Sequence, residues 1–536
     1  MVPEKIDDVT NEPPKNLHVP NWFKQFLIYL RRDVKSKVSN TQYIVLNLTE
    51  APLLGFILSF LIRYTDPNKG HYIFFENENI VPYIFMSIIV ALFLGLTVSA
   101  EEIFRDRKIL KREEFLNLSR SSYLVAKVVI LTFISAVQAI LYVLVGNTML
   151  QFEWDMYGSF WLVLFSMFVF ANMMGLNISS AFNSAVTIYI MIPLLMIPQM
   201  ALGGSMFSFD KLNSIIGSVG KVPIIAELMP SRWSYEALMV KQFRDNKYEK
   251  DFYEKEKEHS YADFKQAYYV EELQNALTKA TECIDSIADD DPEYDTVSIR
   301  RVEEYNLALL REEIVAEMAR VPEFNCKNLH KLTVESFDED VADDVDSYLK
   351  ELKAYYSGIF NKAEKDIEGR KQYYDSQQKG YVNSRRDKYH NDKLRGIVKN
   401  EYETNKIIRY KNRLIQQVDP IFHDADNSSF FGFRAHFYAP RKWFCGKYYD
   451  TFAFDTIVIW LFSLLCYITL YFDVLKKLID WGGNLHYGAL LKKKEKAAPV
   501  AESKEEASKE AAESEETGKN AAIAKLRVVS DDKEDN

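Results

Sequence analysis

Six stretches of this chain are apolar over roughly 20 residues, the length that a helix needs to cross the hydrocarbon core of a bilayer. Buried helices of a soluble protein are the alternative for each stretch, but six of this length disfavour that interpretation. The sequence therefore predicts an all-α integral membrane protein with six transmembrane helices. The expected spans are Tyr43 to Tyr64, Val81 to Ala100, Tyr123 to Val145, Phe160 to Asn177, Ala181 to Phe207 and Phe452 to Phe472.

Basic residues predict the orientation of these spans, because Lys and Arg in short loops resist translocation. They gather before the first span, between the second and third spans, and after the sixth. We therefore expect a multi-pass protein of the inner (cytoplasmic) membrane with both termini in the cytoplasm. The region between the fifth and sixth spans is expected on the periplasmic side, although Arg441, Lys442 and Lys447 lie there just before the last span.

Charge and hydrophobicity change along the chain and indicate how it is organised into segments. The net charge of -10 arises mainly in the polar insert and the tail, and it argues against binding to nucleic acid. No cleavable signal peptide is visible, so the first span is expected to act as the membrane signal. The predicted organisation is a disordered N-terminus (1–19), an amphipathic connecting helix (20–42), spans 1–5 (43–207) with a charged helix at 101–122, an extracytoplasmic helical insert (208–449), span 6 (450–475) and a mostly disordered cytoplasmic tail (476–536).

An apolar residue recurs at every fourth position before the first span, from Trp22 to Val38. Pro20 precedes this stripe and basic residues lie off it, as in an amphipathic helix on a membrane surface. A core helix of a small cytoplasmic domain is the alternative, but little chain precedes it to form a core.

The loop between the second and third spans reads "RDRKILKREEFLNLSRSSYLVAK", from Arg105 to Lys127. Its apolar residues are spaced among charges of both signs, so it is expected to form an amphipathic helix that another protein grips. A solvated loop that only holds basic charge in the cytoplasm is the alternative.

This loop resembles the one that precedes the third span in the G-subfamily of ATP-binding-cassette exporters. "NWFKQFLIYLRRD" is similar to the connecting helix of that family, and "ELMPSRWSYEALMVKQF" is similar to the segment after its fifth span. "AEEIFRDRKILKRE" and "GLNISSAFNSAVTIYI" are more narrowly similar to bacterial members with an enlarged outer insert. The resemblance covers roughly 20–243 and 433–480, and leaves the rest of the insert and the tail unexplained.

The resemblance implies that the charged loop is a coupling helix, which docks on a nucleotide-binding domain and transmits its closure to the spans. Clustered charges of both signs fix the register of such a contact. The residues expected to make it are Arg105, Asp106, Arg107, Lys111, Arg112 and Glu113.

The chain lacks G-x-x-x-x-G-K-[ST], the phosphate-binding motif of an ATPase. We therefore expect a transport subunit that is not itself an enzyme and binds no cofactor, with ATP and Mg on a partner nucleotide-binding domain. That domain is on another chain or on a missing segment. Two membrane halves are expected to form a homodimer or a heterodimer in the bilayer.

Glu50 lies inside the first span, where an ionisable side chain is a functional candidate by default. Its expected partners are basic residues of the connecting or coupling helices, and structural pairing is the simpler interpretation. In the resembling family the second and fifth spans line a central cavity. Residues expected on that translocation path, with ordinary helix packing as the alternative, are Phe85, Phe93, Leu195, Met196 and Met200.

Cys283 and Cys326 both lie in the insert, and a disulfide and two free thiols stay open as alternatives. No histidines are spaced as in a metal site.

The main hypothesis is a permease subunit of an exporter for an amphipathic or lipid-like substrate. A membrane-anchored scaffold whose insert binds another envelope protein is one alternative. An ion-coupled carrier or channel that uses Glu50 is the other.

Overall fold

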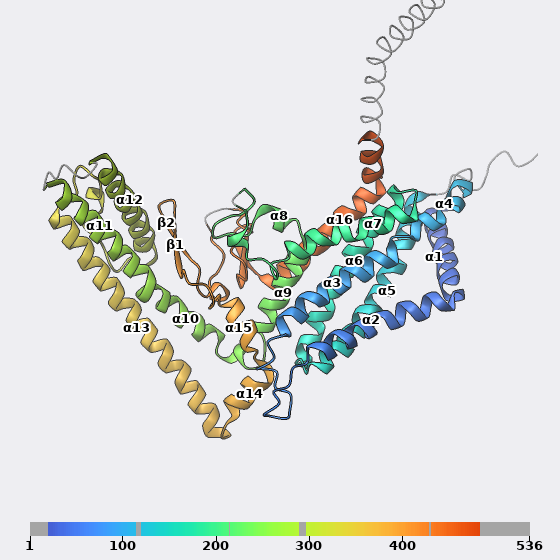
Figure 1. The fold of residues 1–536 in the computed structure, drawn as a ribbon, viewed down its shortest axis with the longest axis horizontal. Helices are drawn as coiled ribbons and strands as arrows, with labels where there is room; N and C mark the ends of the chain where they lie inside the picture. Colours follow the sequence, from blue (N-terminus) through green and yellow to red (C-terminus); the bar gives the residue numbers. More distant parts are fainter. Residues whose placement is uncertain (1–19, 114–118, 214, 289–295, 428–429, 483–536) are drawn as a thin grey trace, which may run out of the picture. The chain divides into compact units, whose positions relative to one another are not determined.

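The computed structural model describes residues 20–113, 119–213, 215–288, 296–427 and 430–482 (Figure 1). The chain divides into two compact units, Met1–Tyr471 and Phe472–Asn536. The described part of the second unit contains a helix over residues 474–482. The elements below all belong to the first unit.

Five helices in the described part of the chain are long and apolar enough to cross a membrane. They match five of the six predicted spans. They are α2 (Thr41–Ile62), α3 (Ile80–Ser99), which continues with little interruption into α4 (Glu102–Glu113), α5 (Arg120–Met149), α6 (Trp154–Ala181) and α16 (Thr451–Tyr471).

The fifth predicted span is shorter than expected. Its apolar residues form α7 (Ala185–Ala201), whose 17 residues correspond to about 25 Å of helix. The prediction of a continuous span from Ala181 to Phe207 was therefore too long at both ends. The helix ends where Gly203 and Gly204 follow, and Gly204 has a φ of +86°, a left-handed conformation that interrupts a helix.

Close packing of α3 against α6 forms the centre of the membrane helices. A Cβ added to Gly95 of α3 would lie 2.6 Å from Ala171 Cβ and 2.9 Å from the Phe168 carbonyl oxygen. Small residues permit such close backbone approach between membrane helices. The short helix α9 (Pro230–Arg244) shares this core, because residues such as Trp233 and Phe243 are fully buried among the spans.

The amphipathic helix predicted before the first span is α1 (Trp22–Ser39). Trp22 and Val38 of its apolar stripe are exposed, whereas Gln25 and Tyr29 on another face are buried against the protein. Phe26 and Leu30 of the stripe are half-buried and pack on the protein core, and the exposed remainder beside the membrane helices fits contact with lipid.

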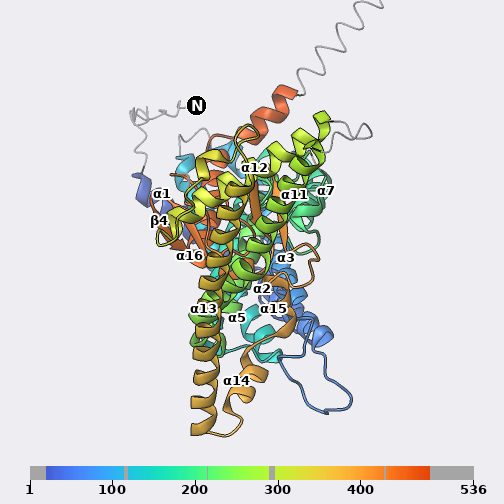
Figure 2. The same ribbon diagram turned by 90° about the vertical axis from the view of Figure 1, so that its left-hand side faces the viewer.

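Four helices and a π-helical turn form a separate bundle in the insert, with its own apolar core (Figures 1 and 2). The bundle contains α10 (Tyr253–Phe264), the π-helical turn Lys265–Tyr269, α11 (Val270–Ala288), α12 (Thr296–Arg320) and α13 (Glu339–Gln377). The remaining helical elements are α8 (Ile224–Glu227), α14 (Tyr381–Tyr389), α15 (Asp392–Val398) and 3₁₀ turns at Phe209–Lys211, Glu249–Asp251, Leu329–Lys331 and Pro420–Phe422.

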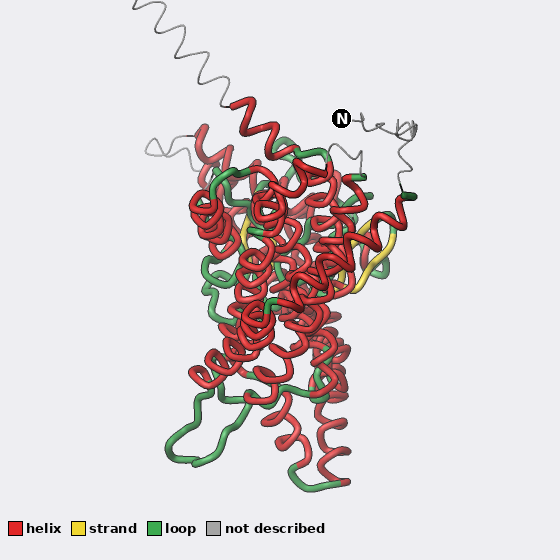
Figure 3. Tube along the Cα trace, turned by 90° about the vertical axis from the view of Figure 1, so that its right-hand side faces the viewer, coloured by secondary structure: helices red, strands yellow, loops and turns green. Residues whose placement is uncertain are grey.

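Two β-hairpins depart from the predicted all-α fold, and Figure 3 shows their strands in yellow. The strands are β1 (Ile407–Tyr410), β2 (Arg413–Gln416), β3 (Arg441–Phe444) and β4 (Lys447–Asp450). The second hairpin turns through Cys445 and Gly446, which both have positive φ (48° and 79°). A two-residue turn with both φ values positive matches the twist of the strands that it joins.

The insert is attached to the loop between α2 and α3. Asn391 Nδ2, at the start of α15, donates to the carbonyl oxygens of Phe74 (2.8 Å) and Asn77 (2.9 Å). The Asp392 amide donates to the Phe75 carbonyl oxygen at 3.1 Å.

Candidate functional site

A buried lysine joins three helices at one end of the membrane bundle. Lys127 of α5 is 3% exposed, and its Nζ lies 2.8 Å from Asp33 Oδ1 on α1. The same nitrogen lies 2.9 Å from Glu102 Oε2 and 3.0 Å from Asp106 Oδ2, both on α4. One cation therefore connects the connecting helix, the charged helix and a membrane span.

Helix periodicity explains how α4 supplies two of these carboxylates. Glu102 and Asp106 are four residues apart, so they lie on the same face, which turns toward α5. Asp106 also accepts a hydrogen bond from the Tyr123 hydroxyl at 3.0 Å. We call the group Lys127, Asp33, Glu102 and Asp106 the Lys127 node.

A second lysine reinforces the node from α1. Lys37 pairs with Glu102, and its Nζ lies 4.7 Å from the centre of the Tyr43 ring. Two cations thus share Glu102, which offsets part of the cost of burying charge.

Arg107 fastens α4 to the end of α6. Its Nη2 donates to the carbonyl oxygen of Ser180 (2.9 Å), in the last turn of that helix, and to that of Phe182 (3.0 Å), just after it. In return, Ser179 Oγ accepts hydrogen bonds from the Ile103 and Phe104 amides at 3.0 and 2.9 Å. These bonds satisfy terminal carbonyls of one helix and terminal amides of the other.

The opposite face of α4 is exposed and cationic. Arg105, Lys108 and Arg112 follow helical spacing along it, and Lys111 lies beside them. Arg105 pairs at 2.5 Å with Glu101, the residue just before α4. We call Arg105, Lys108, Lys111 and Arg112 the basic face of α4.

The six residues predicted for contact with a partner thus separate into two groups. Asp106 and Arg107 bind this chain, whereas Arg105, Lys111 and Arg112 are exposed. The Glu113 side chain lies outside the described part of the structure. Sequence reasoning missed Lys127, although a single lysine inside an apolar span was a signal that could have identified it.

The residues predicted for a translocation path lie on α3 and α7. Phe85 is buried edge-on against Tyr235, with ring centres 5.4 Å apart, whereas Phe93 is exposed. The α7 residues Leu195, Met196 and Met200 are half-buried and pack on the main core.

The basic ion-pair partner expected for Glu50 is not found among the described residues. Glu50 is half-buried on α2 and makes no ion pair with any residue that the structure describes. Lys37 of the connecting helix and Arg107 of the charged helix are bound elsewhere, so a basic partner for Glu50 stays a prediction.

The four cysteines are free thiols in the structure. Cys326 Sγ lies 3.6 Å from Asp344 Oδ2, and burial together with this carboxylate raises the pKa of the thiol to about 11. Within the described ranges, no three His, Cys, Asp or Glu side chains are grouped as a metal ion would require.

Residues 24–243 match a family model described as ABC-2 type transporter. This part of the chain contains almost all of α1 and continues to the end of α9. The match supports an ABC-2 type transporter membrane domain over these residues, whereas the G-subfamily and the type with an enlarged insert stay predictions. No curated protein matches the chain closely enough to count as a relative.

Proposed function

We propose that the ABC-2 type transporter membrane domain of residues 24–243 works as the permease half of an ATP-driven exporter. The substrate is amphipathic or lipid-like, and two membrane halves form the transport path. Nucleotide-binding domains on a partner chain or on a further segment supply the ATPase activity. The termini and α4 face the cytoplasm, and the insert faces the other side of the membrane.

The observation that carries this proposal is the division of α4 into two faces. One face is held by the Lys127 node and by Arg107, so that a displacement of α4 moves α1, α5 and α6 with it. The basic face stays exposed for a partner. A helix with these two faces can transmit a movement from a bound protein to the spans.

The charge of the basic face indicates the chemistry of its partner. Lys108, Lys111 and Arg112 present three exposed cations over little more than one helical turn. A complementary groove on the nucleotide-binding domain is therefore acidic. Such complementarity fixes orientation and speeds association more than it adds affinity.

Association with an ATPase tests the proposal. Tagged full-length protein is purified from native membranes at low and high salt, and copurifying ATP-binding proteins are identified. The variant Lys108→Glu with Lys111→Glu should weaken the association by about tenfold or more, since like charges then face each other. The protein without its partner should not hydrolyse ATP.

A matched control exists on α1, where Lys24 and Lys35 are also exposed. Lys24→Glu with Lys35→Glu makes the same change of net charge and should leave the association intact. Equal loss in both variants, or no loss in either, would contradict a specific role for the basic face of α4.

An ion-coupled carrier is a second candidate because Glu50 lies in a span without an ion pair from the described residues. The two functions differ in their energy source. In proteoliposomes, an exporter of the proposed kind requires ATP and its partner ATPase. Flux that follows an ion gradient without ATP and is abolished by Glu50→Gln would favour the carrier.

A further inference from the structure

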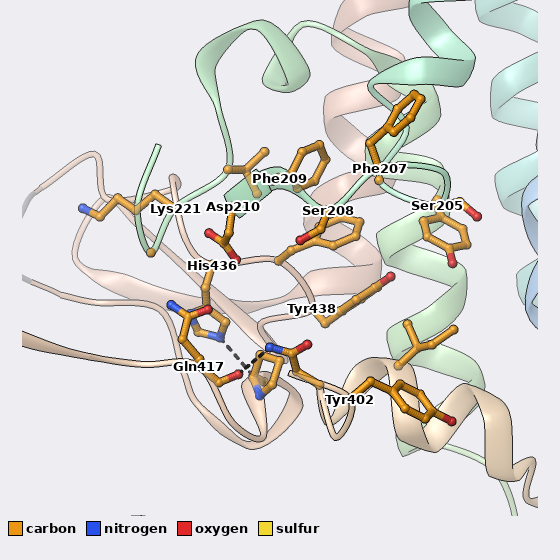
Figure 4. Close-up of a pocket in the computed structure, with 18 of the residues that line it drawn as sticks. Ser205, Phe207, Ser208, Phe209, Asp210, Lys221, Tyr402, Gln417, His436 and Tyr438 are labelled. Atoms are coloured by element: carbon orange, nitrogen blue, oxygen red, sulfur yellow. Dashed lines mark hydrogen bonds between the residues drawn. The ribbon is translucent and has the colours of Figure 1, made fainter. Parts of the chain in front are cut away.

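A pocket of about 270 Å³ lies beyond the end of α7 (Figure 4). Five segments meet there: residues 204–210 after α7, residues 220–222 before α8, Tyr235 of α9, residues 397–420 around the first hairpin, and residues 436–438 before β3. Its volume is near the lower end of the range of about 300–1,000 Å³ for small-molecule sites, so a ligand of one or two rings would fill it.

Aromatic rings form much of the wall. Phe209 packs edge-on against Phe437 with ring centres 5.0 Å apart, and Phe437 lies 4.1 Å from Tyr438. Tyr402, which is exposed, lies at another side of the pocket (Figure 4). Such faces accept the flat, apolar side of a ring.

An amide group points to a ligand in this pocket. Gln417 lines the pocket and is only 8% exposed, yet its side-chain amide makes no hydrogen bond with the described part of the protein. Its backbone is held in place, since its carbonyl oxygen accepts from Asn400 Nδ2 at 2.9 Å. An amide that lines a pocket in this way can both donate to and accept from a hydroxyl group of a ligand.

The charges around the pocket favour an uncharged ligand. Asp210 and Lys221 are one acid and one base on the lining. Burial lowers the pKa of His436 to about 4, and its Nε2 lies 2.9 Å from the Pro420 carbonyl oxygen, so the ring is neutral at physiological pH. No net charge remains to recognise a phosphate or an amine.

A buried ion cluster fixes one wall of the pocket. Tyr438 has a φ of 68°, an unusual conformation for a bulky residue, and its amide donates to Glu236 Oε1 at 3.0 Å. Glu236 in turn lies 2.9 Å from Arg232 and 2.6 Å from Lys442, and all three side chains are fully buried. The strained wall is therefore formed before any ligand arrives.

We infer that this pocket binds an uncharged sugar unit, because aromatic faces and an unpartnered amide suit a ring that carries hydroxyl groups. The inference does not depend on the proposed transport function. Binding should be measurable with the full-length protein alone and without ATP.

Saturation-transfer NMR tests the inference on full-length protein in phosphatidylcholine nanodiscs, which carry no sugar headgroups. The probes are glucose, galactose and N-acetylglucosamine, with glucose 6-phosphate as a charged counterpart. At least one neutral sugar should bind, and the phosphate should bind more weakly than glucose.

Two variants locate the binding. Gln417→Leu keeps most of the side-chain volume and should weaken binding of the neutral sugar by about tenfold, the equivalent of one hydrogen bond. Tyr402→Ala should act similarly, whereas Tyr373→Ala, an equally exposed tyrosine on α13, should have no effect. Unchanged melting temperatures exclude misfolding. The inference fails if no neutral sugar binds, or if folded Gln417→Leu binds as well as the unaltered protein.

Discussion

Replacing Lys127 by methionine removes the cation of the Lys127 node and keeps the length of the side chain. Its Nζ has carboxylate oxygens at 2.8, 2.9 and 3.0 Å, and its side chain is 4% exposed. Asp33, Glu102 and Asp106 have side chains that are 14%, 10% and 22% exposed, so water screens them poorly. Breaking a buried ion pair on one side costs about 3–5 kcal/mol.

Lys350→Met is the matched control for this measurement. Lys350 Nζ lies 2.6 Å from Asp346 on α13, but its side chain is 71% exposed. A surface pair of this kind contributes little, because water and salt screen it. The difference between the two effects reflects both burial and the number of partners, since Lys127 has three carboxylates and Lys350 has one.

The assay is equilibrium unfolding in mixed micelles of detergent and denaturing surfactant, followed by circular dichroism. Lys127→Met should lower the free energy of unfolding by several times the loss in Lys350→Met. Adding Asp33→Asn to Lys127→Met should recover part of the loss, since Lys127 is the only cation that pairs with Asp33 among the described residues. Equal losses for the two lysines, or no recovery with Asp33→Asn, would refute a stabilising role for the node.

Three further predictions concern packing, pH and topology. Gly95→Ala should cost about 1–3 kcal/mol by forcing α3 and α6 apart, whereas Gly158→Ala, with no atom within 4 Å of the added Cβ, should be neutral or stabilising in thermal unfolding. Burial holds the pKa of His390 at about 3, below its ordinary 6.5, so the unfolded chain binds more protons between these values. Stability should then fall with decreasing pH by up to about 1.4 kcal/mol per unit for this group, and melts of His390→Phe should show a shallower slope. A membrane-impermeant maleimide added to intact cells should label Cys445, which is exposed, and spare buried Cys326; labelling of Cys445 only after lysis would overturn the proposed orientation.

Much of the fold followed from local patterns. Long apolar runs predicted five helices that the structure contains, because chain length against bilayer thickness is a one-dimensional property. The charged helix after α3 and the amphipathic helix before α2 were predictable for the same reason, since their apolar residues recur with the period of a helix. The early end of α7 was visible only as the pair Gly203 and Gly204.

Local patterns did not determine which face of α4 turns inward. Asp106 and Arg107 carry the same kinds of charge as their neighbours, and only the positions of α5 and α6 select them for internal contacts. Lys127 likewise depends on Asp33, which is 94 residues away in the chain. The pocket is the extreme case, because Ser205, Gln417 and Tyr438 come from segments that no sequence period connects. Sequence by itself thus determined which segments are helical and apolar, whereas the tertiary structure decided which charges are paired, since pairing depends on distances in space.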